Sequence, residues 1–208
     1  MSSGRDRVEL VATLLLAVAT VATAWSGYQS TRWNGEQAKA AGKANALRVE
    51  SAKAAGLANT ETEIDVATFT QWVNAYTLEQ TELADFYFKR FRKEFTPAVN
   101  AWVATRPLKN ANAPATPFAM PQYRLASRVA AERLEAASAA SSAKVLEYLQ
   151  TASNYVLCVV LFASALFFAG ISTKLTAPAL RIVMVSLGCA VFLLTAIWIA
   201  TSPISLAV

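Results

Sequence analysis

Length, composition and charge narrow the class of protein before any motif is considered. The chain has 208 residues, of which 55% are hydrophobic and only 16% are charged, whereas a soluble domain carries roughly 25% charged residues. It contains no histidine and only two cysteines. Its formal net charge of +5 is too modest to indicate nucleic acid as a partner. The low share of charged residues excludes an ordinary soluble domain. The absence of histidine excludes every enzyme mechanism that uses histidine, the commonest general base, as a catalytic residue.

Three long uncharged stretches indicate three transmembrane helices. They lie between Glu9 and Arg32, between Glu147 and Lys174, and after Arg181. Each exceeds the roughly 20 residues that a helix needs to cross a bilayer, so we expect an all-α membrane protein. The predicted parts are an N-terminal tail (1–7), transmembrane helix 1 (8–31), a helical soluble domain (32–147), transmembrane helix 2 (148–171), a short basic loop (172–179), transmembrane helix 3 (180–201) and a C-terminal tail (202–208).

The first uncharged stretch also has features of a cleaved secretory signal, because Ala22-Thr23-Ala24 fits a cleavage site. The uncharged run continues to Thr31, however, and a signal anchor that stays in place explains that continuation better. We therefore expect the first helix to be retained as a membrane span.

The soluble domain is predicted to be helical from its start. Residues 35–58 are rich in alanine, the best helix former. Thr60 followed by Glu63 fits a capping box, so a new helix is expected to begin there. Its aromatic side chains recur with a period near 3.6, and it should end at about Phe95, before Pro97.

A proline-rich loop, residues 106–121, divides this domain. From Gln122 onward no glycine or proline interrupts the chain before Gly170, so one helix should run from the domain through the second span, with Gly170 as its C-cap. The first two transmembrane helices are thus both predicted to continue into a helical extramembrane bundle. Thr176 and Pro178 should cap and start the third span.

The distribution of basic residues suggests an orientation. Lys174 and Arg181 lie in and after the short loop between the last two spans, which carries no acid, and the positive-inside rule places such a loop in the cytoplasm with Arg5 and Arg7. Residues 32–147 would then lie outside. Basic residues that follow span one support the inverted orientation, which stays an alternative. The aromatic residues expected at the membrane interface are Trp25, Tyr28, Trp33, Tyr155 and Trp198.

The segment from Phe86 to Phe95 combines four basic residues with five aromatic ones. One interpretation is a bundle helix whose rings face the core and whose cations face water, and this is the favoured one. The other is a surface that contacts anionic lipid headgroups or a partner. The side chains that would make this contact are Phe86, Lys89, Arg90, Arg92 and Lys93.

The acidic groups of the domain are interpreted structurally. Glu61, Glu63 and Asp65 lie where a helix N-terminus is expected, and the helix dipole favours negative charge there. The acids of residues 79–85 share one helix face, and without histidine a solvated face is a better interpretation than a carboxylate metal site. We expect no metal and no cofactor.

The spans contain no ionisable residue of the kind that marks an ion or proton path. Gln29 and Asn154 are polar and lie near the outer ends of spans one and two. They would line a pore if several copies assembled around an axis. Small residues in the spans permit close helix contacts, so self-association is expected.

Two stretches of the sequence carry a resemblance. Residues 24–38 (AWSGYQSTRWNGEQA) and residues 161–170 (LFASALFFAG) resemble uncharacterised bacterial membrane proteins with one N-terminal and two C-terminal spans. The likeness covers most of the chain in layout, but it is specific only in these two stretches. It implies a bacterial inner-membrane setting and carries no assigned activity.

These features predict a non-enzymatic integral membrane protein that acts as a helical scaffold or partner-binding module. It is expected to be a homo-oligomer built on helical-bundle or coiled-coil contacts. The expected partners are the lipid bilayer, further copies of the chain and another membrane or envelope protein, but not nucleic acid. The alternative is a subunit of an oligomeric pore or transport assembly, and a membrane enzyme is a remote third hypothesis.

Overall fold

The computed structural model describes the backbone of residues 2–206 and the side chains of residues 7–206. Arg5, one of the residues expected to set the topology, therefore lies outside the described side chains. The described range contains helices and no β-strand. Its elements are α1 (Ser2–Thr77), α2 (Thr81–Phe88), α3 (Thr96–Ala104), the 3-10 turn η1 (Pro117–Ala119), α4 (Ala126–Ser172) and α5 (Pro178–Ala200).

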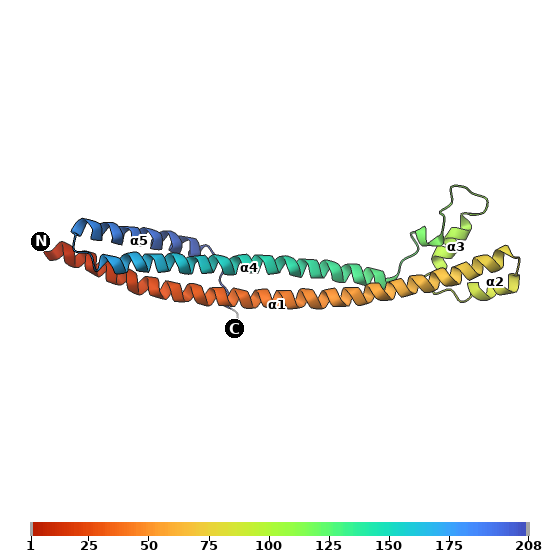
Figure 1. Cartoon of the computed structure of the whole chain (residues 1–208). Helices are drawn as coiled ribbons and strands as arrows, with labels where there is room; N and C mark the ends of the chain where they lie inside the picture. Colours follow the sequence, from red (N-terminus) through yellow and green to blue (C-terminus); the bar gives the residue numbers. More distant parts are fainter. Residues whose placement is uncertain (1, 207–208) are drawn as a thin grey trace. The chain divides into compact units, whose positions relative to one another are not determined.

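Three of these helices, α1, α4 and α5, are long and apolar enough to cross a membrane (Figure 1). Both α1 and α4 continue without interruption beyond their apolar stretches. The predicted all-α membrane fold, in which the first two spans continue into a helical domain, is confirmed. By its internal contacts the chain divides into two compact units: unit 1 is Met1–Gly42 with Ser141–Val208, and unit 2 is Lys43–Ala140.

The predicted helix boundary at Thr60 is wrong, because α1 passes through this position as a continuous helix. The Thr60 hydroxyl donates to the carbonyl of Gly56, one turn earlier, at 3.2 Å, instead of capping a new helix. Threonine in a helix can satisfy its hydroxyl in this way, and the surrounding alanines favour continuation. The first proline of the chain is Pro97, so no strong breaker precedes it.

The predicted end of this helix near Phe95 is also wrong, because α1 ends at Thr77. Glu79 has a φ of 58°, the left-handed conformation that terminates helices. The amide of Glu79 donates to the carbonyl of Tyr76 at 3.2 Å, and the amide of Gln80 to that of Ala75 at 2.9 Å. This is a Schellman motif, in which glutamate holds the position that glycine usually occupies.

The other predicted caps also need correction. Helix α4 begins at Ala126, not at Gln122, and it runs through Gly170 to Ser172. Its last turn is closed by side chains, since the Ser172 hydroxyl donates to the carbonyl of Ala169 at 2.6 Å. Gly170 has no positive φ, so the left-handed C-cap is not formed. Helix α5 starts at Pro178 as expected, but its N-cap is the extended Ala177, not Thr176.

Unit 2 contains a close pairing of α1 with the first part of α4. Ala44 and Ser51 of α1, seven positions apart, both contact α4. The same seven-residue spacing leads to Ala58, Asp65 and Trp72, which are buried. The Ser51 hydroxyl donates to the carbonyl of Ala131, and the Ser138 hydroxyl donates to that of Ala44, both at 2.9 Å. Small side chains allow each helix to reach the backbone of the other.

Unit 1 packs α5 beside the apolar parts of α1 and α4 (Figure 1). Helix α5 approaches both neighbours at Gly188. A Cβ built on Gly188 would lie 3.2 Å from the carbonyl oxygen of Ala165 in α4 and 3.2 Å from the Cδ2 of Leu15 in α1. Ala165 is itself fully buried. The three spans therefore come closest together at Gly188, where the absence of a side chain leaves room for α1 and α4.

Replacing Gly188 by leucine should destabilise unit 1, because the new side chain would collide with the Ala165 backbone and with Leu15. The expected loss is about 1–3 kcal/mol, as for other overpacked interiors, measured as a lower melting temperature in one detergent. Gly170→Ala is the matched control, since a Cβ there meets no atom within 4 Å. Equal melting temperatures for Gly188→Leu and the wild type would contradict the packing described.

Candidate functional site in the helical head

Residues 61–127 of unit 2, here called the head, are built around an aromatic core. Trp72 from the end of α1, Phe91 and Phe95 from the segment between α2 and α3, and Val99 from α3 are all buried. The ring of Phe118, in η1, stacks on that of Phe95 with 5.1 Å between centroids. Edge-to-face and offset contacts of this kind add to the free energy gained by burying apolar area. Contacts between aromatic rings thus hold α3 and η1 against the end of α1.

The segment Phe86–Phe95 contributes to both the core and the surface of the head. Phe91 and Phe95 belong to the core, as the favoured interpretation predicts. Phe86 instead remains 46% exposed, and the guanidinium of Arg90 lies 3.5 Å above its ring. Lys89 and Lys93 are also exposed. One part of the segment therefore builds the core, and the other presents an aromatic ring with cations to the outside.

Arg92 differs from the other cations of this segment, because it points into the head. Its Nη1 donates to Asp65 Oδ2 at 3.0 Å, and its Nη2 lies 2.7 Å from Glu61 Oε1 and 2.8 Å from Glu94 Oε2. Tyr123 donates its hydroxyl proton to the same oxygen of Asp65 at 3.1 Å. One guanidinium thus connects α1 with the segment that follows α2, and Asp65 connects α1 with the residues that precede α4.

Asp65 is fully buried, although it is ionisable. Burial raises the pKa of its carboxyl, against the lowering effects of the Tyr123 hydrogen bond and the Arg92 charge. Burial likewise raises the pKa of the Tyr123 hydroxyl. The other oxygen of Asp65, Oδ1, has no hydrogen-bond partner among the described residues. This carboxyl therefore costs free energy to bury, and Arg92 offsets that cost.

The interpretation of Glu61 and Asp65 as helix N-terminal charges is wrong. Both lie in the middle of α1, because no helix starts at Thr60. Glu61 pairs with Arg92 and also accepts a hydrogen bond from the Ser127 hydroxyl of α4. Their role is to hold the head together. By contrast, Glu82 and Asp85 are exposed on α2, as a solvated acidic face requires.

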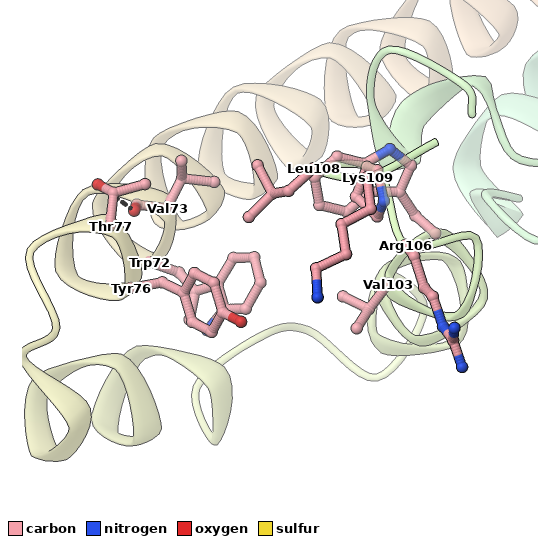
Figure 2. A pocket seen from close by; sticks show the side chains of 10 residues that line it. Trp72, Val73, Tyr76, Thr77, Val103, Arg106, Leu108 and Lys109 are labelled. Atoms are coloured by element: carbon pink, nitrogen blue, oxygen red, sulfur yellow. Dashed lines mark hydrogen bonds between the residues drawn. The ribbon is translucent and has the colours of Figure 1, made fainter. Parts of the chain in front are cut away.

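A cavity of about 400 Å³ opens between the end of α1, the end of α3 and the loop after α3 (Figure 2). Its walls are mainly aromatic and aliphatic. The lining residues are Trp72, Val73, Tyr76, Thr77, Trp102, Val103, Arg106, Pro107, Leu108 and Lys109. This volume lies within the range of small-molecule sites in proteins.

In unit 1 the structure brings several predicted interface and pore residues to the chain after α5. The Gln29 side chain accepts from the amide of Ser205 at 3.0 Å and donates to its carbonyl at 3.4 Å. The Tyr155 hydroxyl and the Trp33 indole both donate to the carbonyl of Pro203, at 2.9 and 3.2 Å. Residues 203–205 are thus held by α1 and α4 through their backbone groups.

The remaining sequence-predicted residues lie as follows. Asn154 accepts from Gln150, one turn earlier in α4, at 3.0 Å. The rings of Trp25 and Tyr28 lie 5.8 Å apart, and both residues are exposed, as is Trp198 in α5. Exposed rings fit a position at the membrane interface.

The basic residues expected to set the topology differ from one another in burial. Arg181 is buried, and its guanidinium lies 3.3 Å from the carboxylate of Glu9, which connects the start of α5 with the start of α1. Arg7 and Lys174 are exposed. Glu9 therefore neutralises part of the positive charge at this end of unit 1.

The chain matches no protein-family model, and the comparisons with curated proteins and with solved structures found no match.

Sequence reasoning missed the cavity, the Arg92 network and the bonds to residues 203–205. Each combines residues that lie far apart in the chain, such as Asp65 with Arg92 and Gln29 with Ser205. A heptad count along α1 could have placed Asp65 on the same face as Ala58 and Trp72, and a buried Asp calls for a partner. The pairing with Arg92 itself has no signal in a single sequence.

Arg92→Met should destabilise the head, because it leaves the buried Asp65 carboxyl and two further acids without their cation. We expect a loss on the order of 2–3 kcal/mol, below the full value for a buried pair since Glu61 and Glu94 are partly exposed. Urea unfolding in detergent, followed by tryptophan fluorescence, measures it. Lys93→Met is the matched control on an exposed neighbour, and an equal effect of both variants would contradict the network.

Proposed function

We propose that the chain is a non-enzymatic integral membrane protein whose head is a partner-binding module. The observation that carries this proposal is the exposed apolar surface of the head. Leu83 and Phe86 of α2 are 42% and 46% exposed, and Leu78, before α2, is 68% exposed. Apolar side chains that gather on one water-facing region mark interaction sites more often than scattered ones do.

The chemistry of the partner follows from the charges beside this apolar region. Lys89, Arg90 and Lys93 are exposed within five consecutive residues, and the segment that carries them follows α2 directly. Arg90 is fixed over the Phe86 ring and also donates to the Phe86 carbonyl at 3.2 Å. A protein surface with apolar and acidic residues complements this arrangement. We take another membrane or envelope protein as the partner.

The setting that fits the proposal is a bacterial inner membrane, with the N-terminus in the cytoplasm and residues 32–147 in the periplasm. The resemblance of residues 24–38 and 161–170 to bacterial membrane proteins supports the first part. Lys174 and Arg181, beside the short connection between α4 and α5, support the second. The pairing of Arg181 with Glu9 weakens this charge signal, so the orientation needs its own measurement.

Cysteine labelling in cells with a permeabilised outer membrane measures the orientation. Leu108→Cys should react with a membrane-impermeant maleimide, because Leu108 is 77% exposed. Lys174→Cys should not react until the inner membrane is opened. The native Cys158 and Cys189 lie within the apolar stretches of α4 and α5, so they give little background. Labelling of position 174 alone would reverse the proposed orientation.

Self-association is part of the proposal, since large apolar side chains also remain exposed on the paired helices of unit 2. Leu57 and Ile64 of α1 are 56% and 48% exposed, and Val129 of α4 is 57% exposed. A further copy could cover them through coiled-coil contacts. The alternative, a pore lined by Gln29 and Asn154, requires several copies around an axis. Mass photometry in nanodiscs tests both hypotheses, because a single copy excludes the pore and argues against self-association.

Photo-cross-linking in cells tests the partner surface. p-Benzoylphenylalanine at position 86 replaces one exposed ring by a similar one and should give a discrete protein adduct. Reversing the charge of Lys89 and Arg90 should reduce that adduct at least about fivefold, because the attraction to an acidic surface is lost. Position 129, which is 57% exposed and lies outside the head, is the control, and an adduct there with the mass of two copies reports self-association instead of the partner.

The partner proposal fails under three outcomes of this experiment. The same adduct with a different protein from positions 86 and 129 would mean that the head has no selective partner. An adduct of unchanged yield after charge reversal would contradict the proposal that the partner surface is acidic. Cross-links to lipid alone would mean that this surface contacts the membrane and not a protein partner.

A further inference from the structure

The head cavity has an aromatic wall that is assembled before any ligand arrives. The rings of Trp72 and Tyr76, one turn apart on α1, stack with 5.4 Å between centroids and 28° between planes. Trp72 is buried, whereas Tyr76 is 55% exposed, so the tyrosine ring presents a free apolar area. Val103 and Leu108, which face it across the cavity (Figure 2), are 44% and 77% exposed.

The polar groups of the neighbouring walls are already satisfied within the protein. The indole of Trp102 donates to the carbonyl of Pro114 at 2.7 Å. The Thr77 hydroxyl donates to the carbonyl of Val73 at 3.0 Å. Neither group needs a ligand, so the aromatic part of the cavity favours an apolar body.

The charges that line the cavity are all positive. Among its lining residues, Arg106 and Lys109 are the ionisable cations and no carboxylate occurs. Neither cation forms an ion pair with the residues that the structure describes. In Figure 2 the Lys109 side chain extends into the space between Tyr76 and Val103, whereas the Arg106 guanidinium points away from it. One ammonium group is thus directed into an otherwise apolar space.

The loop that carries Lys109 is held in place by its own hydrogen bonds. The amides of Lys109 and Asn110 donate to the carbonyl of Arg106 at 2.8 and 3.0 Å. The Asn110 side chain donates to the carbonyl of Thr105 at 3.2 Å. Arg106 has a φ of 53°, a left-handed conformation that costs a non-glycine residue free energy. An arrangement kept at such a cost is a reason to look for a function.

An adjoining hollow shows the opposite charge. It shares Trp72, Tyr76 and Leu108 with the cavity, but it is lined by Glu79 and Asp85. An anionic group would be repelled there and attracted at Lys109. The charges around Trp72 and Tyr76 therefore favour an anion at Lys109 and disfavour one beside Glu79 and Asp85.

We propose that this cavity binds a small organic carboxylate with an apolar body. The body lies against the exposed ring of Tyr76, between Val103 and Leu108, and the carboxylate pairs with the ammonium of Lys109. The volume of about 400 Å³ suits a molecule of one aromatic ring with a short chain. This inference goes beyond the proposed protein partner, which contacts Phe86 and its neighbouring cations, and either can fail without the other.

Calorimetry on the full chain in nanodiscs tests the proposal with 3-phenylpropionate as the probe. The acid should bind saturably, and its neutral amide should bind about tenfold or more weakly, because a charge-assisted hydrogen bond is lost. Lys109→Met should weaken binding of the acid to the level of the amide. Lys53→Met, which removes an exposed lysine of α1 outside both the cavity and the partner surface, should leave the dissociation constant unchanged.

A second variant separates the apolar part from the charge. Tyr76→Ala should weaken the acid and the amide by a similar factor, since it removes the surface against which both bodies lie. Circular dichroism confirms that each variant folds. The proposal is overturned if the acid shows no saturable binding at millimolar concentration, if acid and amide bind equally, or if Lys109→Met binds the acid as the wild type does. The cross-linking result at position 86 is independent of all three outcomes.

Discussion

The head depends on the interaction between Arg92 and the buried carboxyl of Asp65. Asp65 lies on the face of α1 that packs inward, at a position where its neighbours seven residues away are Ala58 and Trp72. A charge there is expensive to bury without a partner. Arg92 supplies the partner from the segment between α2 and α3, so the free energy of the ion pair is available only when that segment folds back on α1. The aromatic core then forms around it, since Phe91 and Phe95 flank Arg92 in the sequence and are carried inward with it.

The same constraint explains how one segment can provide both a core and a surface. Residues 86–95 do not form one regular helix, because α2 ends at Phe88 and α3 begins at Thr96. The side chains between them are therefore not sorted by a single helical period. Phe95 and Arg92 point inward, while Lys89 and Lys93 remain in water. A basic surface beside an aromatic core thus follows from the irregular backbone between α2 and α3.

Much of the fold could be predicted from the sequence because its strongest signals are local. The absence of charge over 20 or more residues located the three spans, and proline and asparagine located the loop that ends near Pro121. The failures concern residues whose effect depends on context. Thr60 resembles a cap but bonds backward within α1, and Gly170 resembles a C-cap but lies inside α4. Glu79, which no propensity marks as a terminator, ends the longest helix. Within the candidate site, the aromatic residues were identifiable, whereas the depth of Asp65 and the direction of Lys109 depend on tertiary contacts.

The bonds between Gln29 and Ser205 join positions 176 residues apart. Gln29 belongs to the first of the three candidate spans that the structure describes, and Ser205 follows the third. Because the chain is synthesised from its N-terminus, Gln29 cannot bond to Ser205 until α5 has been made and the residues after it have turned back toward α1. Completion of this contact can only be a late event in biogenesis.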